Sequence, residues 1–327
     1  MYPKIFIKAA MLVLPALLAQ AAIAQGAAQG YPARTIRIIA PFPPGATLDM
    51  LTRLVAQKLG EDWGASVIVE NKSGGGGVIG IDAGAKAAPD GYTFITVPNS
   101  FAANPILRKD LPYDTWKDFV PVTLLGITPH ILVTNPNVPA KTTQELVALA
   151  KQQPGKLSYA SFGNGTTPHL AGETLKQMAG IDIIHVPYRG QVQALTDLIG
   201  GQVTMNFGNL PDVMGHVKAG KLKAIAIASP ERSALAPDIP TLEEGGLTGF
   251  TSDSWFVLVA PAKTPPEIVR KVQMQIADIM RRPDVKARLA SAGVEPSGNT
   301  PEQAAAFLQD QAAKYGKTIK TANIKAD

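Results

Sequence analysis

The sequence predicts an α/β fold with two lobes that face each other across a cleft. Over residues 36–97, apolar β-branched runs alternate with segments of helical periodicity, as expected of a parallel sheet covered by helices. The alternation breaks at residues 98–105 and resumes over residues 142–228. The chain then returns to the first lobe through residues 255–261. Two crossings between two lobes imply a hinge and a cleft.

The first unit, residues 36–56, is predicted as a strand, a turn and the start of a helix. Ile36, Ile38 and Ile39 are typical of a buried strand, and Pro-Pro-Gly marks the turn. Thr47 is predicted to cap the helix, with its hydroxyl free to face a ligand, and Asp49 to lie in the first turn. The unpaired N–H groups of a helix start favour an anion, but for this stretch taken alone an ordinary first β-α unit is the favoured explanation.

The other elements are predicted from the same periodicities. Gly75, Gly77 and Gly80 fit G-x-G-x-x-G, but the acid that a dinucleotide site needs at the end of the next strand is missing. We therefore expect a glycine-rich turn that lines the cleft. The remaining strands are predicted at residues 66–70, 92–97, 120–126, 131–134, 157–160, 183–186, 202–207, 221–228 and 255–261. Helices are predicted at residues 78–88, 142–151, 168–179, 191–199, 212–218, 266–280 and 301–315.

The N-terminus has the pattern of an export signal. Lys4 and Lys8 precede an apolar run, and Ala22-Ile23-Ala24 forms a small-x-small cleavage site. A protein exported without a single cysteine depends on its hydrophobic cores, which favours the bacterial periplasm. The formal charge of +5 is scattered rather than clustered, which argues against a nucleic-acid partner.

A second loop, in residues 159–173 (YASFGNGTTPHLAGE), repeats the design of the first. A strand ends, small polar residues follow, and a helix begins near Pro168, at a position that proline favours. Its hydroxyl, amide and N–H groups are suited to ligand oxygen atoms, although ordinary capping is an equal alternative for this loop alone. One such loop in each lobe favours an anion held between them.

Several other side chains have a structural and a functional interpretation. His169 and Glu173 have metal-ligand spacing, but without a second cluster a packing or capping role is favoured for His169. Arg189, beside Tyr188, lies at a rim or clamps a carboxylate. Trp255 belongs to the core or walls the cleft. The chain has no G-x-S-x-G motif, and neither spacing nor composition assembles a catalytic set.

Taken together, the motifs resemble Bug-type periplasmic solute-binding proteins, the receptors related to tripartite tricarboxylate transporters. The segments that carry this resemblance span nearly the whole mature chain in order. They are YPARTIRIIAPFPPGATLDMLTRLVA (31–56), ENKSGGGGVIG (70–80), KAAPDGYTF (86–94), LPYDTWKDFVPVTLLG (111–126), GNGTTPHLAGE (163–173), HVPYRG (185–190), DLIGGQV (197–203), ERSALAPDIPTLEEGG (231–246) and WFVLVAPAKTP (255–265).

The resemblance implies a type II Venus-flytrap fold, with mixed-sheet lobes that close on a ligand. It implies that residues 42–49 and 161–167 hold a carboxylate, and that Ser100 and Asn104 lie at the first crossing. The family's Pro-Gly-Gly turn reads Pro44-Gly45-Ala46 here, and Ala46 restricts the backbone. The full set of expected ligand-binding residues is Phe42, Pro44, Gly45, Ala46, Thr47, Asp49, Ser100, Asn104, Ser161, Asn164, Thr166, Thr167, His169, Tyr188, Arg189 and Asp253.

The expected division is a signal peptide at 1–24, lobe 1 at 25–102 and 225–327, and lobe 2 at 103–224. We expect a monomeric, non-enzymatic receptor without cofactor or metal, which takes a di-, tri- or aromatic carboxylate and meets membrane permease subunits transiently. Phe101 and Phe162, beside the ligand loops, favour a flat or aromatic acid. An exported enzyme acting on a carboxylate or ester, and a module that serves a membrane sensor, are the alternatives.

Overall fold

The computed structural model describes residues 30–321 and residue 324, so the predicted signal peptide lies outside the described residues. Within the described part, no helix has the length and apolar character needed to cross a membrane. The strands are β1 (Ile36–Ala40), β2 (Val67–Asn71), β3 (Thr93–Pro98), β4 (Phe119–Thr134), β5 (Ser158–Ser161), β6 (Ile184–Pro187), β7 (Met205–Asn209), β8 (Lys223–Ile227), β9 (Asp253–Pro261) and β10 (Glu295–Pro296). The helices are α2 (Thr47–Trp63), the short 3₁₀ helix η1 (Gly75–Gly77), α3 (Val78–Ala85), α4 (Ser100–Leu107), α5 (Thr143–Gln152), α6 (Thr167–Ala179), α7 (Gln191–Ile199), α8 (Leu210–Lys218), α9 (Pro266–Arg281), α10 (Pro283–Ser291) and α11 (Pro301–Thr321).

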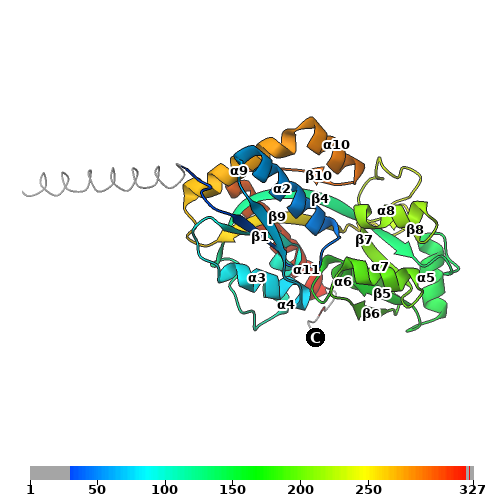
Figure 1. Cartoon of the computed structure of the whole chain (residues 1–327). Helices are drawn as coiled ribbons and strands as arrows, with labels where there is room; N and C mark the ends of the chain where they lie inside the picture. Colours follow the sequence, from blue (N-terminus) through cyan, green and yellow to red (C-terminus); the bar gives the residue numbers. More distant parts are fainter. Residues whose placement is uncertain (1–29, 322–323, 325–327) are drawn as a thin grey trace, which may run out of the picture.

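Two groups of mixed strands form the framework, in the order β2-β1-β3-β9-β4-β7-β5-β6 (Figure 1). In the first group β1 pairs in parallel with β2 and β3, whereas β9 is antiparallel to both β3 and β4. In the second group β5 pairs in parallel with β6 and β7, and β4 is antiparallel to β7 and β8. Parallel neighbours direct their carboxyl ends to one edge, which is where loops form sites in such sheets.

Strand β4 joins the two groups. The sequence predicts two runs, at residues 120–126 and 131–134, but the structure has one strand of 16 residues. Its first part pairs with β9 as far as Pro129, and from His130 onward it pairs with β7. The residues between the two predicted runs are therefore bonded to β9, a partner that local periodicity does not reveal.

Helix α4 corrects a second expectation. Residues 98–105 are predicted to break the regular structure, yet Ser100–Leu107 is helical with Pro105 inside. Proline lacks the N–H group that would bond to the carbonyl of Phe101. That carbonyl instead accepts a long hydrogen bond from the Thr115 hydroxyl, at 3.4 Å. A tertiary contact thus partly compensates for the proline.

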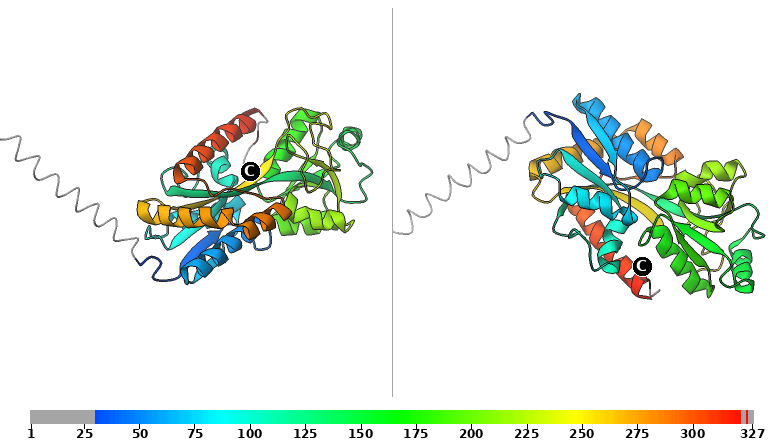
Figure 2. Two further views of the ribbon diagram at one scale, coloured as in Figure 1. Left: turned by 90° about the horizontal axis from the view of Figure 1, so that it is seen from above. Right: turned by 60° about the horizontal axis from the view of Figure 1, so that its bottom comes forward.

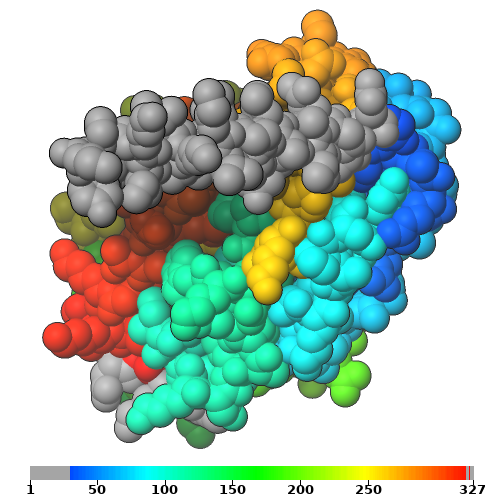
Figure 3. Space-filling model, turned by 90° about the vertical axis from the view of Figure 1, so that its left-hand side faces the viewer, coloured from blue at the N-terminus to red at the C-terminus, as the bar shows by residue number. Residues whose placement is uncertain are grey.

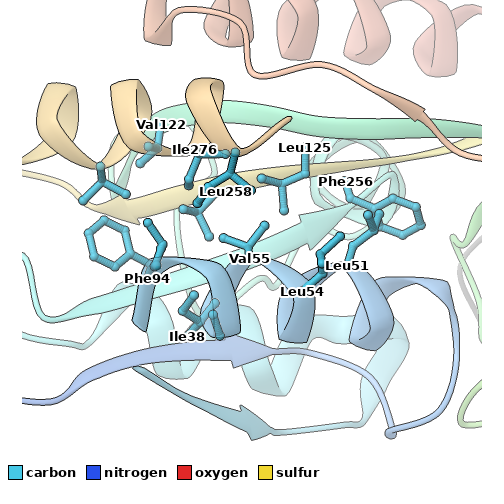
Figure 4. Close-up of a cluster of buried hydrophobic side chains, with 14 of the residues drawn as sticks. Ile38, Leu51, Leu54, Val55, Phe94, Val122, Leu125, Phe256, Leu258 and Ile276 are labelled. Carbon is cyan, nitrogen blue, oxygen red and sulfur yellow. The ribbon is translucent and has the colours of Figure 1, made fainter. Parts of the chain in front are cut away.

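Helices cover both faces of each group of strands (Figure 2). Figure 4 shows one face of the first group, where Leu51, Leu54 and Val55 of α2 point toward Leu258 of β9 and Ile276 of α9. Helices α3, α4 and α11 cover the opposite face, and the C-terminal helix, in red, reaches the surface beside the teal-green part of the chain in Figure 3. In the second group, α5 and α6 cover one face, and α7 and α8 the other.

Most of the expected elements are present, with ends shifted by a few residues, whereas α10 and β10 have no counterpart in the prediction. The lobe boundaries stay a prediction. Strand pairing places β8, at Lys223–Ile227, against the second half of β4 and therefore in the second group.

Candidate ligand-binding site between the two groups of strands

A cavity of about 50 Å³ lies where loops from the two groups of strands meet. It is bordered by the N-terminal ends of five helices, α2, α4, α6, α7 and α8, and by the start of β9. The walls are largely apolar, with a few polar groups, as in many small-molecule sites. The lining residues are Phe42, Pro43, Ala46, Leu48, Pro98, Asn99, Ser100, Phe162, Thr166, Thr167, Gln191, Val192, Asn209, Ser254 and Phe256.

The β1–α2 loop reaches this cavity through Phe42 and Ala46. Ala46, at φ −103° and ψ 175°, has an ordinary extended backbone as N-cap of α2. The positive φ of 97° falls on Gly45, where glycine is favoured. Replacement of the family's second glycine by alanine is therefore tolerated by the backbone. Pro44 and Gly45 are exposed, outside the cavity lining.

Asp49 organises this loop from behind rather than lining the cavity. Its carboxylate accepts from the backbone N–H of Gly45 at 3.1 Å, from Asn71 Nδ2 at 2.9 Å and from Arg53 Nε at 2.9 Å. Burial would raise the pKa of Asp49, but these hydrogen bonds outweigh it and hold the pKa below its ordinary value. The ionised form is thus the one that the loop stabilises.

Thr47 is not the helix cap, which corrects the prediction. Ala46 takes the cap position, and Thr47, the first residue of α2, is turned toward the second group of strands. Its N–H and its hydroxyl both donate to Asp212 Oδ1 of α8, at 2.9 Å and 2.8 Å. The carboxylate that satisfies the start of α2 comes from 165 residues away, so sequence reasoning missed it.

Asp212 is therefore a direct contact between the two groups of strands. Its other oxygen accepts from Asn209 Nδ2 at 2.9 Å. Burial raises the pKa of Asp212 to about 6, against the opposing effect of the bonds from Thr47 and Asn209. The sequence does predict a helix at residues 212–218 with Asp212 as its first residue, and an acid at a helix start was the one indication that Asp212 could have a role here.

The β5–α6 loop contributes Phe162, Thr166 and Thr167 to the cavity. Two of its hydroxyls are engaged locally: Ser161 Oγ lies 2.6 Å from His185 Nε2, and Thr166 Oγ1 donates to the Gly163 carbonyl at 2.6 Å. The loop therefore offers the cavity mainly the start of α6.

Two further predicted ligand-binding residues, His169 and Asn164, lie outside the cavity lining. His169 Nδ1 accepts from the Gly165 N–H at 3.2 Å, a capping role, and Glu173 accepts from the Tyr159 hydroxyl at 2.6 Å. The backbone of Asn164 packs against the glycine-rich turn. A methyl group on Gly76 would lie 2.7 Å from the backbone carbonyl oxygen of Asn164. No three metal-ligating side chains gather anywhere in the described part of the chain.

The β3–α4 connection supplies Ser100. Its hydroxyl is buried and has no hydrogen-bond partner, and the side chain lines the cavity. Asn104, one turn further along α4, is also buried but makes only a long contact from its Nδ2 to the Tyr113 hydroxyl, at 3.5 Å, and lies outside the lining. A buried unpartnered hydroxyl indicates a missing hydrogen-bonding group.

Three predicted residues lie away from this cavity. The Tyr188 hydroxyl donates to Asp197 at 2.8 Å, and burial together with this carboxylate raises its pKa to about 12. Arg189 is exposed. Asp253 lines a different cavity beside Lys314, and burial raises its pKa against the opposing charge of Lys314.

The aromatic residues are divided between the core and the cavity wall, and not all of them lie where the sequence predicts. Phe101 is 1% exposed and packs edge to face on Phe119, with ring centroids 5.2 Å apart, so its expected role beside the ligand is wrong. Phe162 does line the cavity. Trp255 belongs to the core, where its indole N–H donates to Tyr315, whereas Phe256 next to it lines the cavity because strand residues alternate in direction.

Sequence reasoning also missed Gln191 and Asn209. Both are 4% exposed, and both line the cavity. Gln191 directly follows the HVPYRG segment, and Asn209 ends β7. Ligands of such sheets bind beyond the carboxyl ends of the strands, so the position of these residues just after predicted strands could have identified them.

Comparisons with known proteins place this arrangement in a family. The model of the tripartite tricarboxylate transporter family receptor matches residues 51–324. The chain is similar to Protein BugT of Bordetella pertussis, at 36% identity over 96% of this chain and 98% of that protein. Rpa4515 of R. palustris with adipate is similar in structure, with a TM-score of 0.88 and 33% identity over 90% of this chain and 99% of the other. MatC from Rhodopseudomonas palustris with bound malate has a TM-score of 0.84 and 30% identity over 88% and 100% of the chains. The chain therefore belongs to the tripartite tricarboxylate transporter family of receptors, which are solute-binding proteins with a two-lobed type II fold.

Proposed function

We propose that this protein is an extracytoplasmic receptor that binds a small organic carboxylate in the cavity between its two groups of strands. The observation that carries this proposal is the convergence of helix N-termini on one cavity that also holds the unpartnered Ser100 hydroxyl. Two relatives were solved with the carboxylates adipate and malate.

The electrostatics of the cavity support an anion. The first N–H groups of a helix lack partners within the helix and carry the positive end of its dipole. At the starts of α2 and α6 the cavity is lined by Ala46, Leu48, Thr166 and Thr167. The N–H groups of Thr47 and Thr166 are already bonded, to Asp212 and to the Gly163 carbonyl, so the ligand would take the other N–H groups of these first turns. Neutral donors in a site that excludes water hold a carboxylate without a buried counter-charge.

The size and walls of the cavity favour a small ligand. A volume of about 50 Å³ corresponds to roughly four water molecules. Phe42, Phe162 and Phe256 supply apolar parts of the cavity wall. Phe101 lies in the core and only Phe162 of the two expected rings lines the cavity, so a short aliphatic acid fits better than an aromatic one.

Transport rather than catalysis is the proposed role. The protein would act as a monomer in the periplasm after removal of its signal peptide, and deliver the acid to membrane permease subunits of a tripartite-type transporter. The receptor family supports this role. The proposed ligand contacts, directly or through water, are the cavity-lining residues of the two loops and of α4: Phe42, Ala46, Leu48, Ser100, Phe162, Thr166 and Thr167. Asp49 and Asn104 support them from behind.

A thermal-shift screen of ligand-stripped protein tests the proposal. A ligand at 100 times its dissociation constant stabilises the folded state by about 2.7 kcal/mol, which raises the melting temperature measurably. We expect one or a few carboxylates to do so and the matched uncharged amides to fail. Product formed on incubation with the bound acid would favour an enzyme, and no stabilisation by any carboxylate would contradict the receptor.

A further inference from the structure

We propose that the ligand carries, besides its carboxylate, a hydrogen-bond donor (a hydroxyl or an ammonium group) that Gln191 Oε1 and Asn209 Oδ1 accept. This inference rests on the proposed function and narrows the ligand class. Both oxygen atoms are buried in the cavity lining, and neither has a hydrogen-bond partner.

The orientation of the Gln191 amide is fixed by a chain of directed bonds. The backbone carbonyl of Ala160 can only accept, so Asn206 must present its Nδ2 to it, at 2.9 Å. Asn206 Oδ1 then faces Gln191, whose Nε2 lies 3.4 Å away. Turning either amide would place two like groups against each other. Gln191 Oε1, an acceptor, is therefore the atom left without a partner in this cavity-lining residue.

The Asn209 amide is fixed by an independent contact. An ionised carboxylate only accepts, so Asp212 Oδ2 requires the Nδ2 of Asn209, at 2.9 Å. Asn209 also faces His130, where it opposes the lowering of the His130 pKa by burial. Both ring nitrogens of His130, however, already lie within 2.9 Å of serine hydroxyls, those of Ser252 and Ser254, and Asn209 Oδ1 makes no hydrogen bond. Asn209 Oδ1 is therefore left as a second acceptor.

The close packing behind these amides restricts any rearrangement. Gly208 lies beside them, and a methyl group there would come within 2.8 Å of Gln191 Nε2 and 3.0 Å of Asn206 Oδ1. Gly208 thus packs directly against the amides of Gln191 and Asn206, and a side chain at this position would displace them.

Two buried acceptors have a direct consequence for selectivity. A ligand that offers them no hydrogen leaves both desolvated and unsatisfied, and a second carboxylate placed there meets like partial charges. A ligand with a hydroxyl or ammonium group satisfies at least one of them. Sites built around such a bond reject the analogue that lacks it.

Matched sets of acids test this inference by calorimetric titration of the mature chain at pH 7.5. Each set keeps the carbon skeleton and changes one substituent: propanoate, lactate and alanine; succinate, malate and aspartate; glutarate, 2-hydroxyglutarate and glutamate. In the set that binds best, we expect the hydroxy or amino acid to bind at least about tenfold more tightly than the unsubstituted acid. The comparison of hydroxyl with ammonium within that set identifies the donor.

A variant assigns the discrimination to the amide. Gln191→Met removes one acceptor at similar size and is expected to reduce the preference for the substituted acid to less than threefold, because the substituted acid loses a bond and the unsubstituted acid no longer leaves this oxygen unsatisfied. Gln193→Met, at an exposed position on the same helix, is the control and should keep the wild-type preference. Unchanged melting temperatures establish that both variants are folded.

The outcomes separate the two proposals. Binding of the unsubstituted acid equal to or tighter than that of its partners overturns the donor requirement and leaves the carboxylate receptor standing. A preference that survives Gln191→Met and Asn209→Leu together, in a variant that remains folded, also overturns it. No binding by any acid contradicts the receptor and the donor requirement with it.

Discussion

Asp49 shows how a buried carboxylate supports the site without touching the cavity. It joins the turn at Gly45 to Asn71 of β2 and to Arg53 of its own helix. We expect Asp49→Ala to lower stability by about 1 kcal/mol, as the loss of a helix-capping bond does, and to weaken ligand binding about fivefold by loosening the first turn of α2. Thermal unfolding and calorimetric titration measure the two effects.

Asp49→Asn provides the control for this residue. The amide oxygen still accepts from the Gly45 N–H, so the variant is expected to recover most of the lost affinity. If Asp49→Ala binds as tightly as the wild type, the turn does not depend on this carboxylate, and Asp49 has no part in positioning the site.

Thr47 and Asp212 link two elements that are distant in sequence, α2 and α8. Thr47→Val removes the 2.8 Å hydroxyl bond to Asp212 but keeps the shape of the side chain. If this contact stabilises the ligand-bound arrangement, its loss should raise the dissociation constant about fivefold, since a typical hydrogen bond contributes about 1 kcal/mol. Titration of the best ligand measures the change.

Thr52→Val is the matched control on the same helix. Thr52 is equally buried, and its hydroxyl bonds only to the Leu48 carbonyl of α2 at 2.7 Å. It should leave the affinity unchanged. An equal loss of ligand affinity in Thr47→Val and Thr52→Val would mean that the effect comes from α2 itself and not from its contact with α8.

The pH dependence of this contact follows from Asp212. Its pKa is raised from 3.8 to about 6, so the folded structure binds the proton more tightly than the unfolded chain. Its contribution to stability is therefore greatest below about pH 4, falls as the pH rises to about 6 and is constant above. The full shift corresponds to at most about 3 kcal/mol, reduced because the residue as a whole is only partly buried.

Asp212→Asn isolates this titration from that of other groups. The unfolding free energy of the wild type, minus that of Asp212→Asn, should decrease between pH 4 and pH 6 and then level off. A difference that increases over this range would show that the pKa is lowered, and that the bonds from Thr47 outweigh burial.

At the scale of elements, local periodicity predicted the strands and helices that follow it. Ile36–Ala40 and Gln191–Ile199 lie where the apolar patterns place them. Periodicity failed where a distant partner decides the structure. Thr115 partly compensates for Pro105 within α4, and β9 keeps β4 continuous past Pro129.

In the candidate site, too, the features that depend on local sequence patterns could be predicted and those that depend on distant contacts could not. The two loops and Ser100 could be found because a strand followed by small polar residues and a helix is a local pattern. The roles of Asp212, Gln191 and Asn209 depend on contacts between the two groups of strands. The direction of a side chain within an element decided the rest, since Phe101 turned to the core and Phe162 to the cavity.

At the scale of the whole molecule, the fold explains why the site lies where it does. Strand β4 runs through both groups of strands (Figure 1). Loops from both groups line the same cavity. Five helices begin there, and the polar groups without partners, Ser100, Gln191 and Asn209, belong to both groups. We therefore expect the Ser100 hydroxyl to donate to the carboxylate of the ligand. Gln191 and Asn209 would accept from a neighbouring hydroxyl or ammonium group of the same ligand.

A crystal structure of the protein grown with its best-binding acid tests this account most directly. We expect density for the acid in the cavity, with a carboxylate at the start of α2 and α6 and near Ser100, and with a hydroxyl or ammonium group directed to Gln191 and Asn209. An acid bound in another cavity, or bound here with its carboxylate against the two amide oxygens, would contradict the account.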